Sequence, residues 1–115
     1  MNVTISEFGS VGTKVTLVGK LDIAGAEVVS LPMATVAGQT VNMVIDMSGV
    51  SFIASIGIRH LVIAAKTVSR RSGKLVLLAP TPLVTEVLVT SGLEDLLPIV
   101  HSEDEAVAAL ARPAG

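Results

Sequence analysis

The chain has 115 residues, half of them hydrophobic, and a net charge of 8 − 10 = −2. A chain of this length can bury about two-thirds of its unfolded surface, so we expect one domain over residues 1–115. It contains no cysteine, which excludes disulfides, thiolate catalysis and cysteine-bound zinc. Only two residues, Phe8 and Phe52, are aromatic, and an acidic chain with so few stacking side chains is a poor candidate for nucleic-acid binding.

The amino-terminal segment is predicted to form a β-hairpin. Polar and apolar residues alternate from Asn2 to Ser6 and from Lys14 to Leu17, with the turn residues Gly9-Ser10-Val11-Gly12 between them. The turn lacks the glycine and lysine spacing of a phosphate-binding loop and leads into a strand. Residues Met1 to Thr4 have neither the basic leader nor the apolar core of a secretion signal, so we expect a cytoplasmic protein.

A helix and a buried strand follow the hairpin. Residues Ala24 to Ala37 are rich in Ala and Val, with Pro32 bending or dividing the predicted helix. The short apolar run from Val41 to Asp46 predicts a strand covered on both faces, and Met47 to Ala54 are predicted to form a loop. Val28 to Ile45 carry no charge over eighteen residues. The proline and the polar turn within that stretch favour a helix end, a turn and a strand over a membrane span.

The second half of the chain alternates helices and strands. The predicted elements are a helix from Ser55 to Ser72, a strand from Lys74 to Ala79, a helix from Pro82 to near Ser91-Gly92, an edge strand from Leu97 to Val100, and a helix from Ser102 to Ala111. Gly73 is expected to be the left-handed residue that ends the first of these helices, and Thr81 to be an N-cap. Pro98 favours a sheet edge, and Ser102 with Glu105 has capping-box spacing.

The order of these elements predicts the fold class. Two strands and a helix are followed by three strand and helix alternations, and such alternation is typical of parallel strands joined by helices. We therefore expect an α/β fold with a mixed, largely parallel sheet of four to five strands, packed with about four helices.

Ser55 is the residue with the clearest chemical potential. It lies where a buried strand and its loop enter a helix, and unpaired backbone N–H groups at a helix start favour an anion. A phosphoryl group on Ser55 would be well placed there. The alternative is that Ser55 is simply the N-cap of its helix, since serine is a leading cap residue.

Three segments together resemble the STAS domain family. The stretch from Asp46 to Ile58, Asp-Met-Ser-Gly-Val-Ser-Phe-Ile-Ala-Ser-Ile-Gly-Ile, is similar to the family signature of a strand-ending acid, a hydrophobic loop and Asp-Ser-Ser/Thr-Gly-Leu. Gly19-Lys20-Leu21-Asp22 resembles the family's Gly-Glu-Leu-Asp, and Ser91-Gly92-Leu93 resembles its Ser-Gly-Leu. The resemblance covers almost the whole chain and implies the STAS fold.

The resemblance also implies a function, because single-domain members include bacterial anti-sigma factor antagonists. Such a protein binds an anti-sigma factor that is also a serine kinase and so releases a sigma factor. Phosphorylation of the matching serine, here Ser55, blocks binding, and a phosphatase restores it. The docking surface implied for this chain comprises the loop around Asp22, the segment leading to Ser55 and the first turns of the following helix. Its expected partner-binding residues are Asp22, Asp46, Ser48, Ser51, Ile53, Ala54, Ile56, Gly57 and Arg59.

Two residues depart from the family signature. Ala54 stands where the family has an acid, and Ile56 stands where it has a second hydroxyl residue. Either change removes a potential kinase determinant, and Ile56 near Ile53 enlarges an apolar docking patch. The alternative function is therefore a constitutive STAS interaction module, such as a soluble subunit of a membrane transport system.

Catalysis and metal binding find less support in the sequence. Ser55 with His60 or His101 suggests a nucleophile and base, but a hydrolase elbow needs Gly two residues before the serine, where this chain has Ile53. The two histidines have no carboxylate or cysteine at ligand spacing, so no metal or cofactor is expected. The basic group Arg70, Arg71 and Lys74 fits a helix carboxyl end better than a nucleic-acid site.

Overall fold

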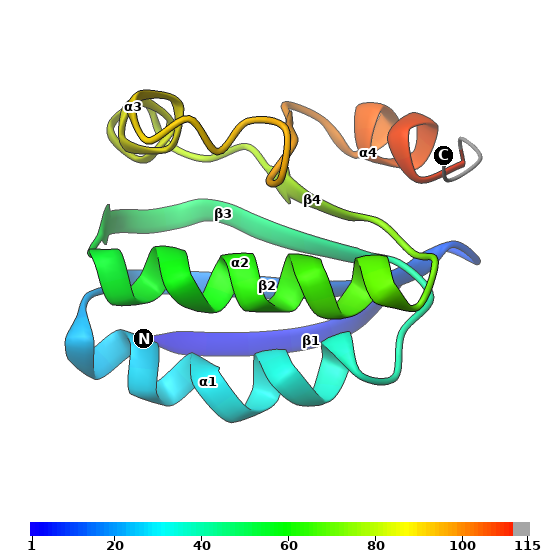
Figure 1. The fold of residues 1–115 in the computed structure, drawn as a ribbon, viewed down its shortest axis with the longest axis horizontal. Helices are drawn as coiled ribbons and strands as arrows, with labels where there is room; N and C mark the ends of the chain where they lie inside the picture. Colours follow the sequence, from blue (N-terminus) through cyan, green and yellow to red (C-terminus); the bar gives the residue numbers. More distant parts are fainter. Residues whose placement is uncertain (112–115) are drawn as a thin grey trace.

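The computed structural model describes residues 1–111, which form a five-stranded sheet and four helices (Figure 1). The elements are β1 (Asn2–Phe8), β2 (Gly12–Leu21), α1 (Ile23–Ala37), β3 (Met43–Ile53), α2 (Ser55–Arg70), β4 (Leu75–Leu78), α3 (Pro82–Thr90), β5 (Ile99–Val100) and α4 (Glu103–Ala111). This order and number confirm the fold class predicted from the sequence.

The strands lie side by side in the order β1-β2-β3-β4-β5. β1 is antiparallel to β2 because the short turn around Gly9 joins them directly, and Gly9 has the positive φ of 55° that such a turn favours. β2, β3, β4 and β5 are parallel to one another, since each pair is joined through a helix. The carboxyl ends of the parallel strands therefore all lie at one end of the sheet.

The two faces of the sheet carry separate apolar clusters. Side chains on alternate positions of β2, β3 and β4, among them Val15, Ile45 and Leu77, pack beneath α1, α2 and α3. On the opposite face, Val44, Val76 and residues of α4 form a smaller cluster. α4 packs on β4 and β5, and toward β2 the same face is open, where Val18 is 47% exposed and Ser48 is exposed.

The prediction of a loop from Met47 to Ala54 is wrong for residues 47–53, which continue β3 as a strand. They pair in parallel with the second half of β2, from Val18↔Gly49 to Leu21↔Ile53, and two register shifts, beside Thr16/Val18 and Gly19/Lys20 of β2, each add one residue to β3. Met47, Val50 and Ile53 are buried at three-residue spacing, which neither the two-residue strand period nor the helix period predicts. The irregular pairing explains why the sequence pattern did not reveal the strand.

The carboxyl end of α2 also differs from the prediction. The helix ends at Arg70, and the left-handed residue is Ser72, with φ 66°, while Gly73 has no positive φ. A Cβ on Gly73 would lie 1.8 Å from the Val41 carbonyl oxygen, so glycine is needed for close approach of two backbones. The position requires glycine for a different reason from the one predicted.

The remaining caps are as expected. Thr81 is the N-cap of α3, where its side chain accepts a hydrogen bond from the Val84 N–H. The Ser102 hydroxyl accepts from the Glu105 N–H at 3.1 Å, and the Glu105 carboxylate accepts from the His101 N–H at 2.7 Å. β5 lies at the sheet edge as predicted, and among residues 1–111 no helix combines the length and apolarity needed to cross a membrane.

Candidate functional site

The first turns of α1, α2 and α3 meet at the carboxyl ends of β2, β3 and β4. The Ala54 N–H donates to the Leu21 carbonyl at 2.9 Å, which joins the start of α2 to the end of β2. The Thr81 hydroxyl lies 3.4 Å from the Val50 carbonyl and joins the start of α3 to β3. Ligands of open α/β folds commonly bind at this end of the sheet.

Two glycines allow the backbones at this end to approach closely. A Cβ on Gly57 would lie 2.6 Å from Cγ of the fully buried Leu21, and one on Gly25 would lie 2.1 Å from the Lys20 carbonyl oxygen. The first turns of α1 and α2 are thus pressed against the end of β2. The starts of α1 and α2 are positioned mainly by these close approaches, which leaves some exposed side chains nearby free.

Ser55 is one of those free side chains. Its residue is the first of α2, and the N-cap is Ala54, so the interpretation of Ser55 as the N-cap is wrong. Ser55 is exposed, and its hydroxyl makes no hydrogen bond within residues 1–111. Neither a capping side chain nor an acidic residue occupies the first turn of α2. The first N–H groups of the helix therefore remain available to an anion on the Ser55 oxygen.

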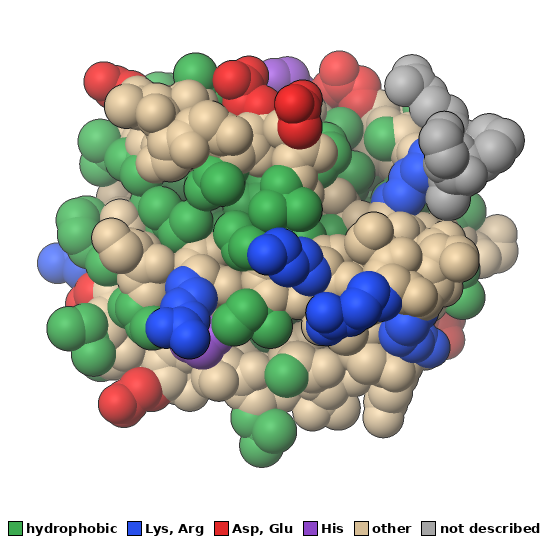
Figure 2. Space-filling model, in the orientation of Figure 1, with side chains coloured by type: hydrophobic (Ala, Val, Ile, Leu, Met, Phe, Trp, Pro, Cys, Tyr) green, Lys and Arg blue, Asp and Glu red, His purple; other side chains and the backbone are tan. Residues whose placement is uncertain are grey.

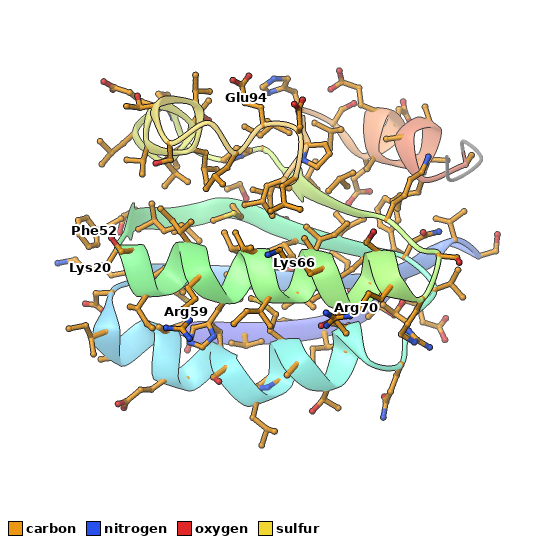
Figure 3. The ribbon with its side chains drawn as sticks, viewed as in Figure 1. Lys20, Phe52, Arg59, Lys66, Arg70 and Glu94 are labelled. Carbon is orange, nitrogen blue, oxygen red and sulfur yellow. The ribbon has the colours of Figure 1, made fainter. Side chains whose placement is uncertain are left out.

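Exposed apolar side chains lie at the same end of the sheet as Ser55, and the sequence pattern did not predict them. Ile23 on α1 is 72% exposed, Leu83 on α3 is 54% exposed and Phe52 on β3 is 44% exposed. Phe52 is paired with Lys20 beside the start of α2 (Figure 3). We call the surface formed by Ile23, Phe52, Ser55 and Leu83 the Ser55 end. Large apolar residues beside a helix start, at positions expected to be exposed to solvent, are the sequence signal that would have identified the Ser55 end.

Most of the predicted partner-binding residues lie near the Ser55 end. Ser51 is exposed, and Ala54 and Ile56 are half-buried. Asp22 is also half-buried, and its Oδ1 accepts from the Gly25 N–H at 2.8 Å as the N-cap of α1. Arg59 is exposed one turn further along α2. These residues can therefore contribute to one surface.

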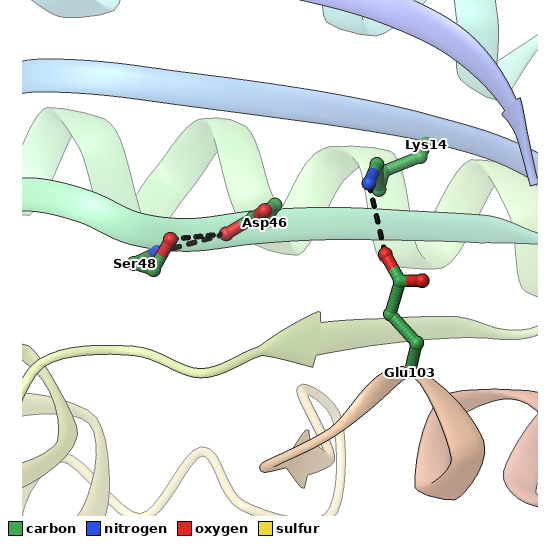
Figure 4. A network of polar contacts seen from close by, with 4 residues as sticks. All are labelled: Lys14, Asp46, Ser48 and Glu103. Carbon is green, nitrogen blue, oxygen red and sulfur yellow. Dashed lines mark hydrogen bonds and ion pairs between the residues drawn. The ribbon is translucent and has the colours of Figure 1, made fainter.

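Four other predicted residues do not present side chains at this surface. Asp46 and Ser48 lie within β3 on the opposite, open sheet face, where Asp46 Oδ1 accepts from both the N–H and the hydroxyl of Ser48 (Figure 4). The prediction that Asp46 is a loop residue near Ser55 is wrong, because Asp46 lies within β3, seven positions or roughly 20 Å before its last residue, Ile53. Ile53 and Gly57 are buried beneath the surface, so their role is packing.

Charge is divided unevenly over the molecule. Arg59, Lys66 and Arg70 recur at positions that share one face of α2, and none makes an ion pair with any of residues 1–111. Figure 2 shows these cations over α2, with acidic side chains gathered over α3 and α4. A partner that reaches from the Ser55 end along α2 would meet positive charge.

The histidines are not arranged for catalysis with Ser55. His60 is five residues from Ser55 on the same helix, about 140° around the axis and about 7.5 Å along it. His60 instead lines a groove between α1 and α2 with Ser30 and Thr67, and His101 is exposed beyond β5. Within the described part of the chain, no three His, Asp or Glu side chains gather as a metal site.

Comparisons with known proteins agree with this architecture. The profile of the STAS domain matches residues 2–106. BtrV of Bordetella bronchiseptica, named as a candidate anti-sigma factor antagonist, is 34% identical over 67 residues. That match covers 58% of this chain, and the chain spans 58% of the length of BtrV.

Solved structures share the fold over nearly the whole chain. An anti-sigma factor antagonist from Mycobacterium paratuberculosis superposes with a TM-score of 0.84 at 22% identity, covering 96% of this chain and 94% of that one. The antagonist SpoIIAA in its unphosphorylated form superposes with a TM-score of 0.77 at 22% identity, covering 94% of this chain and 95% of that one. These likenesses establish the arrangement of strands and helices.

Proposed function

The chain belongs to the STAS domain family, and on that premise we propose that it is an anti-sigma factor antagonist. In this proposal the Ser55 end binds an anti-sigma factor that is also a serine kinase, and binding releases a sigma factor. The protein acts in the cytoplasm by reversible association and performs no catalysis itself. The observation that carries the proposal is an exposed serine with a free hydroxyl at a helix start without a capping side chain, at the same end of the sheet as three exposed apolar side chains.

The apolar residues around Ser55 supply the attraction in this proposal. Ile23, Phe52 and Leu83 each expose a large apolar side chain at this end of the sheet, and burying such surface stabilises a complex by about 25 cal/mol per Å². The cations along α2 add charge complementarity to an acidic partner surface. The Asp22 carboxylate accepts a hydrogen bond from the Gly25 N–H of α1, which fixes the orientation of the loop beside the Ser55 end.

Phosphorylation would reverse this attraction. The kinase transfers a phosphoryl group from a nucleoside triphosphate to the Ser55 oxygen, the hydroxyl proton is released, and the nucleoside diphosphate leaves. The product adds about 1.5 to 2 negative charges within an apolar contact surface, where they would have to be desolvated on binding. The free N–H groups of the first turn of α2 stabilise the phosphate in the unbound protein. A serine phosphatase restores the hydroxyl.

The environment of Ser55 also supports the alternative of a constitutive interaction module. Ala54 and Ile56, which replace an acid and a hydroxyl of the family signature, are both half-buried beside the serine. In that case the same surface binds a partner permanently, such as a membrane transport complex, and Ser55 is never modified.

Incubation with each candidate anti-sigma kinase cloned from the native genome distinguishes the two functions. For the antagonist, intact mass should show one phosphate on the wild-type chain and none on Ser55→Ala. Ser55→Asp should weaken binding to the kinase by at least about 100-fold, measured with a label on the partner because this chain has no Trp or Tyr.

Ser69→Asp is the matched control, because Ser69 is an exposed serine on the same helix at its other end. It should leave kinase binding within about twofold of wild type. Equal affinity of Ser55→Asp and wild type would contradict the switch at this residue. Co-purification with a transport complex, without phosphate on Ser55, would favour the constitutive module.

A further inference from the structure

The two edges of the sheet are protected very differently. β5 is only two residues long and follows Pro98, so it offers little backbone for further pairing. β1 is seven residues long, contains neither proline nor lysine, and has no partner strand on its outer side among residues 1–111. Proteins usually blunt such edges with charge, proline or a covering segment, because a bare edge pairs with other strands.

Exposed apolar side chains accompany this bare edge. Ile5 in β1 is 50% exposed, and it pairs with Val15, whose side chain is buried on the face that α1 and α2 cover. Directly opposed residues of an antiparallel pair point to the same face, so Ile5 points toward the α1 side of the sheet. The edge is therefore apolar on the side where α1 lies beside β1 (Figure 1).

The outer flank of α1 continues that apolar strip. Ser30, Met33 and Ala34 face α2 across a shared groove. Val28 lies about 160° around the helix from Ser30 and so points away from α2. Val28 is 49% exposed and Leu31, on the outermost part of the helix, is 75% exposed.

We propose that β1 and the outer flank of α1 form an interface between two copies of this chain. The two β1 strands pair antiparallel across a two-fold axis, which joins the sheets into one ten-stranded sheet and brings Val28 and Leu31 of each α1 against the other copy. The charge distribution suits a second copy. β1 carries only Glu7, near its end, and α1 carries only Glu27, so no like charges meet at the centre of the pair.

The dimensions of the surface predict a reversible dimer. Seven strand residues span roughly 23 Å, and fifteen helix residues also span about 23 Å, so the strand and helix layers match in length. A strand layer and a helix layer are each about 10 Å thick, so a strip this long and about 20 Å deep covers on the order of 460 Å² per copy, or roughly 900 Å² in total. Interfaces below about 1,200 Å² are typical of transient association.

The antiparallel pairing would place the two Ser55 ends at opposite ends of the dimer. Each copy of β3 runs opposite to its equivalent across the axis, so the carboxyl ends of the parallel strands point away from each other. Dimer formation therefore leaves the Ser55 end of each copy free. The dimer proposal does not depend on the function proposed for the Ser55 end.

Sedimentation velocity over a concentration series tests the proposal. The mass of the wild-type protein should rise from the monomer value of 11.8 kDa toward twice that value. Ile5→Lys, which places a charge on the edge strand, and Leu31→Glu, which places one on the helix flank, should each raise the dimer Kd at least about tenfold. Hydrogen exchange of β1 amides should slow as the dimer forms, while exchange of β5 amides should not change.

Two matched substitutions serve as controls. Val41→Lys alters an apolar residue that is 70% exposed in a loop, and Val107→Glu alters one that is 44% exposed on α4. Both should leave the dimer Kd within about twofold of wild type. Circular-dichroism melting establishes that each variant is folded. A wild-type protein that stays monomeric up to about 1 mM, or a dimer that persists in either Ile5→Lys or Leu31→Glu, would overturn the proposal.

Discussion

The two ends of α2 are held in place by different kinds of contact. At the carboxyl end, polar side chains bind the backbone. The Arg71 guanidinium donates to the Ala37 and Thr40 carbonyls, and Asn42 bridges the Val11 carbonyl and the Lys74 N–H at 2.9 Å each. At the amino end, the backbone is positioned by the Leu21 carbonyl and by close approach at Gly57, and the Ser55 side chain has no such role.

This difference indicates which end is available for recognition. At the carboxyl end of α2 the polar side chains hydrogen-bond to the backbone of the folded protein. Substituting them should therefore lower the free energy of unfolding before it affects binding. At the amino end the side chains of Ile23, Phe52, Ser55 and Leu83 are exposed, so they can change with little effect on the fold. The comparison predicts large stability effects at one end of α2 and small ones at the other.

The largest effect should follow substitution of Gly73. In Gly73→Ala the new Cβ would overlap the Val41 carbonyl oxygen, 1.8 Å away, and the backbones of two segments would have to separate. We expect the free energy of unfolding, measured by urea denaturation, to fall by about 3 kcal/mol. Gly38→Ala is the control, since its Cβ would lie 3.4 Å from the nearest oxygen and should change stability by less than about 1 kcal/mol. Equal effects of the two changes would break the comparison at this end.

Gly73 also illustrates what the sequence could and could not reveal. A glycine after a helix indicates a position where only glycine fits. The sequence does not show whether the reason is a left-handed backbone conformation or the close approach of a second backbone, because both require glycine. Which of them applies depends on Val41, which is distant in sequence. The same limit explains β3, because its extension to Ile53 depends on an irregular pairing with β2 in which β3 carries the extra residues. Local periodicity was sufficient for the order of elements and the starts of α3 and α4, since those features depend on nearby residues.

The candidate site was predictable to a similar extent. The signature around Ser55 located the serine and the adjacent Ser51, Ala54 and Ile56, because they are close in sequence. It did not show that Asp46 and Ser48 lie on the open sheet face, since strand length and bulges decide the face. It also did not predict Ile23 and Leu83, which reach the Ser55 end only because the parallel strands place three helix starts together.

An intermediate effect is expected for Arg71 at the carboxyl end. Arg71→Ala removes the guanidinium that donates to the Ala37 and Thr40 carbonyls, and it should lower the free energy of unfolding by about 1.5 kcal/mol. Arg70→Ala is the matched control, because Arg70 is an exposed neighbour with no hydrogen bond to residues 1–111, and it should cost less than about 0.5 kcal/mol. If thermal and urea denaturation show the same loss for both variants, the guanidinium contacts do not hold this end of the helix.

The smallest effect should occur at Ser55, and its sign is the informative quantity. A carboxylate at the first position of α2 faces the positive end of the helix dipole and unpaired N–H groups, so Ser55→Asp should raise the free energy of unfolding by about 0.5 kcal/mol. Ser69→Asp places the same charge near the negative end and should lower it by a similar amount, although Arg70 is nearby. Both effects should shrink at high salt, because the two positions are exposed. A variant that is more stable yet binds the anti-sigma kinase more weakly would separate recognition from folding at this residue. If Ser55→Asp instead destabilises the protein as much as Ser69→Asp does, the N–H groups at the start of α2 do not stabilise a negative charge at residue 55.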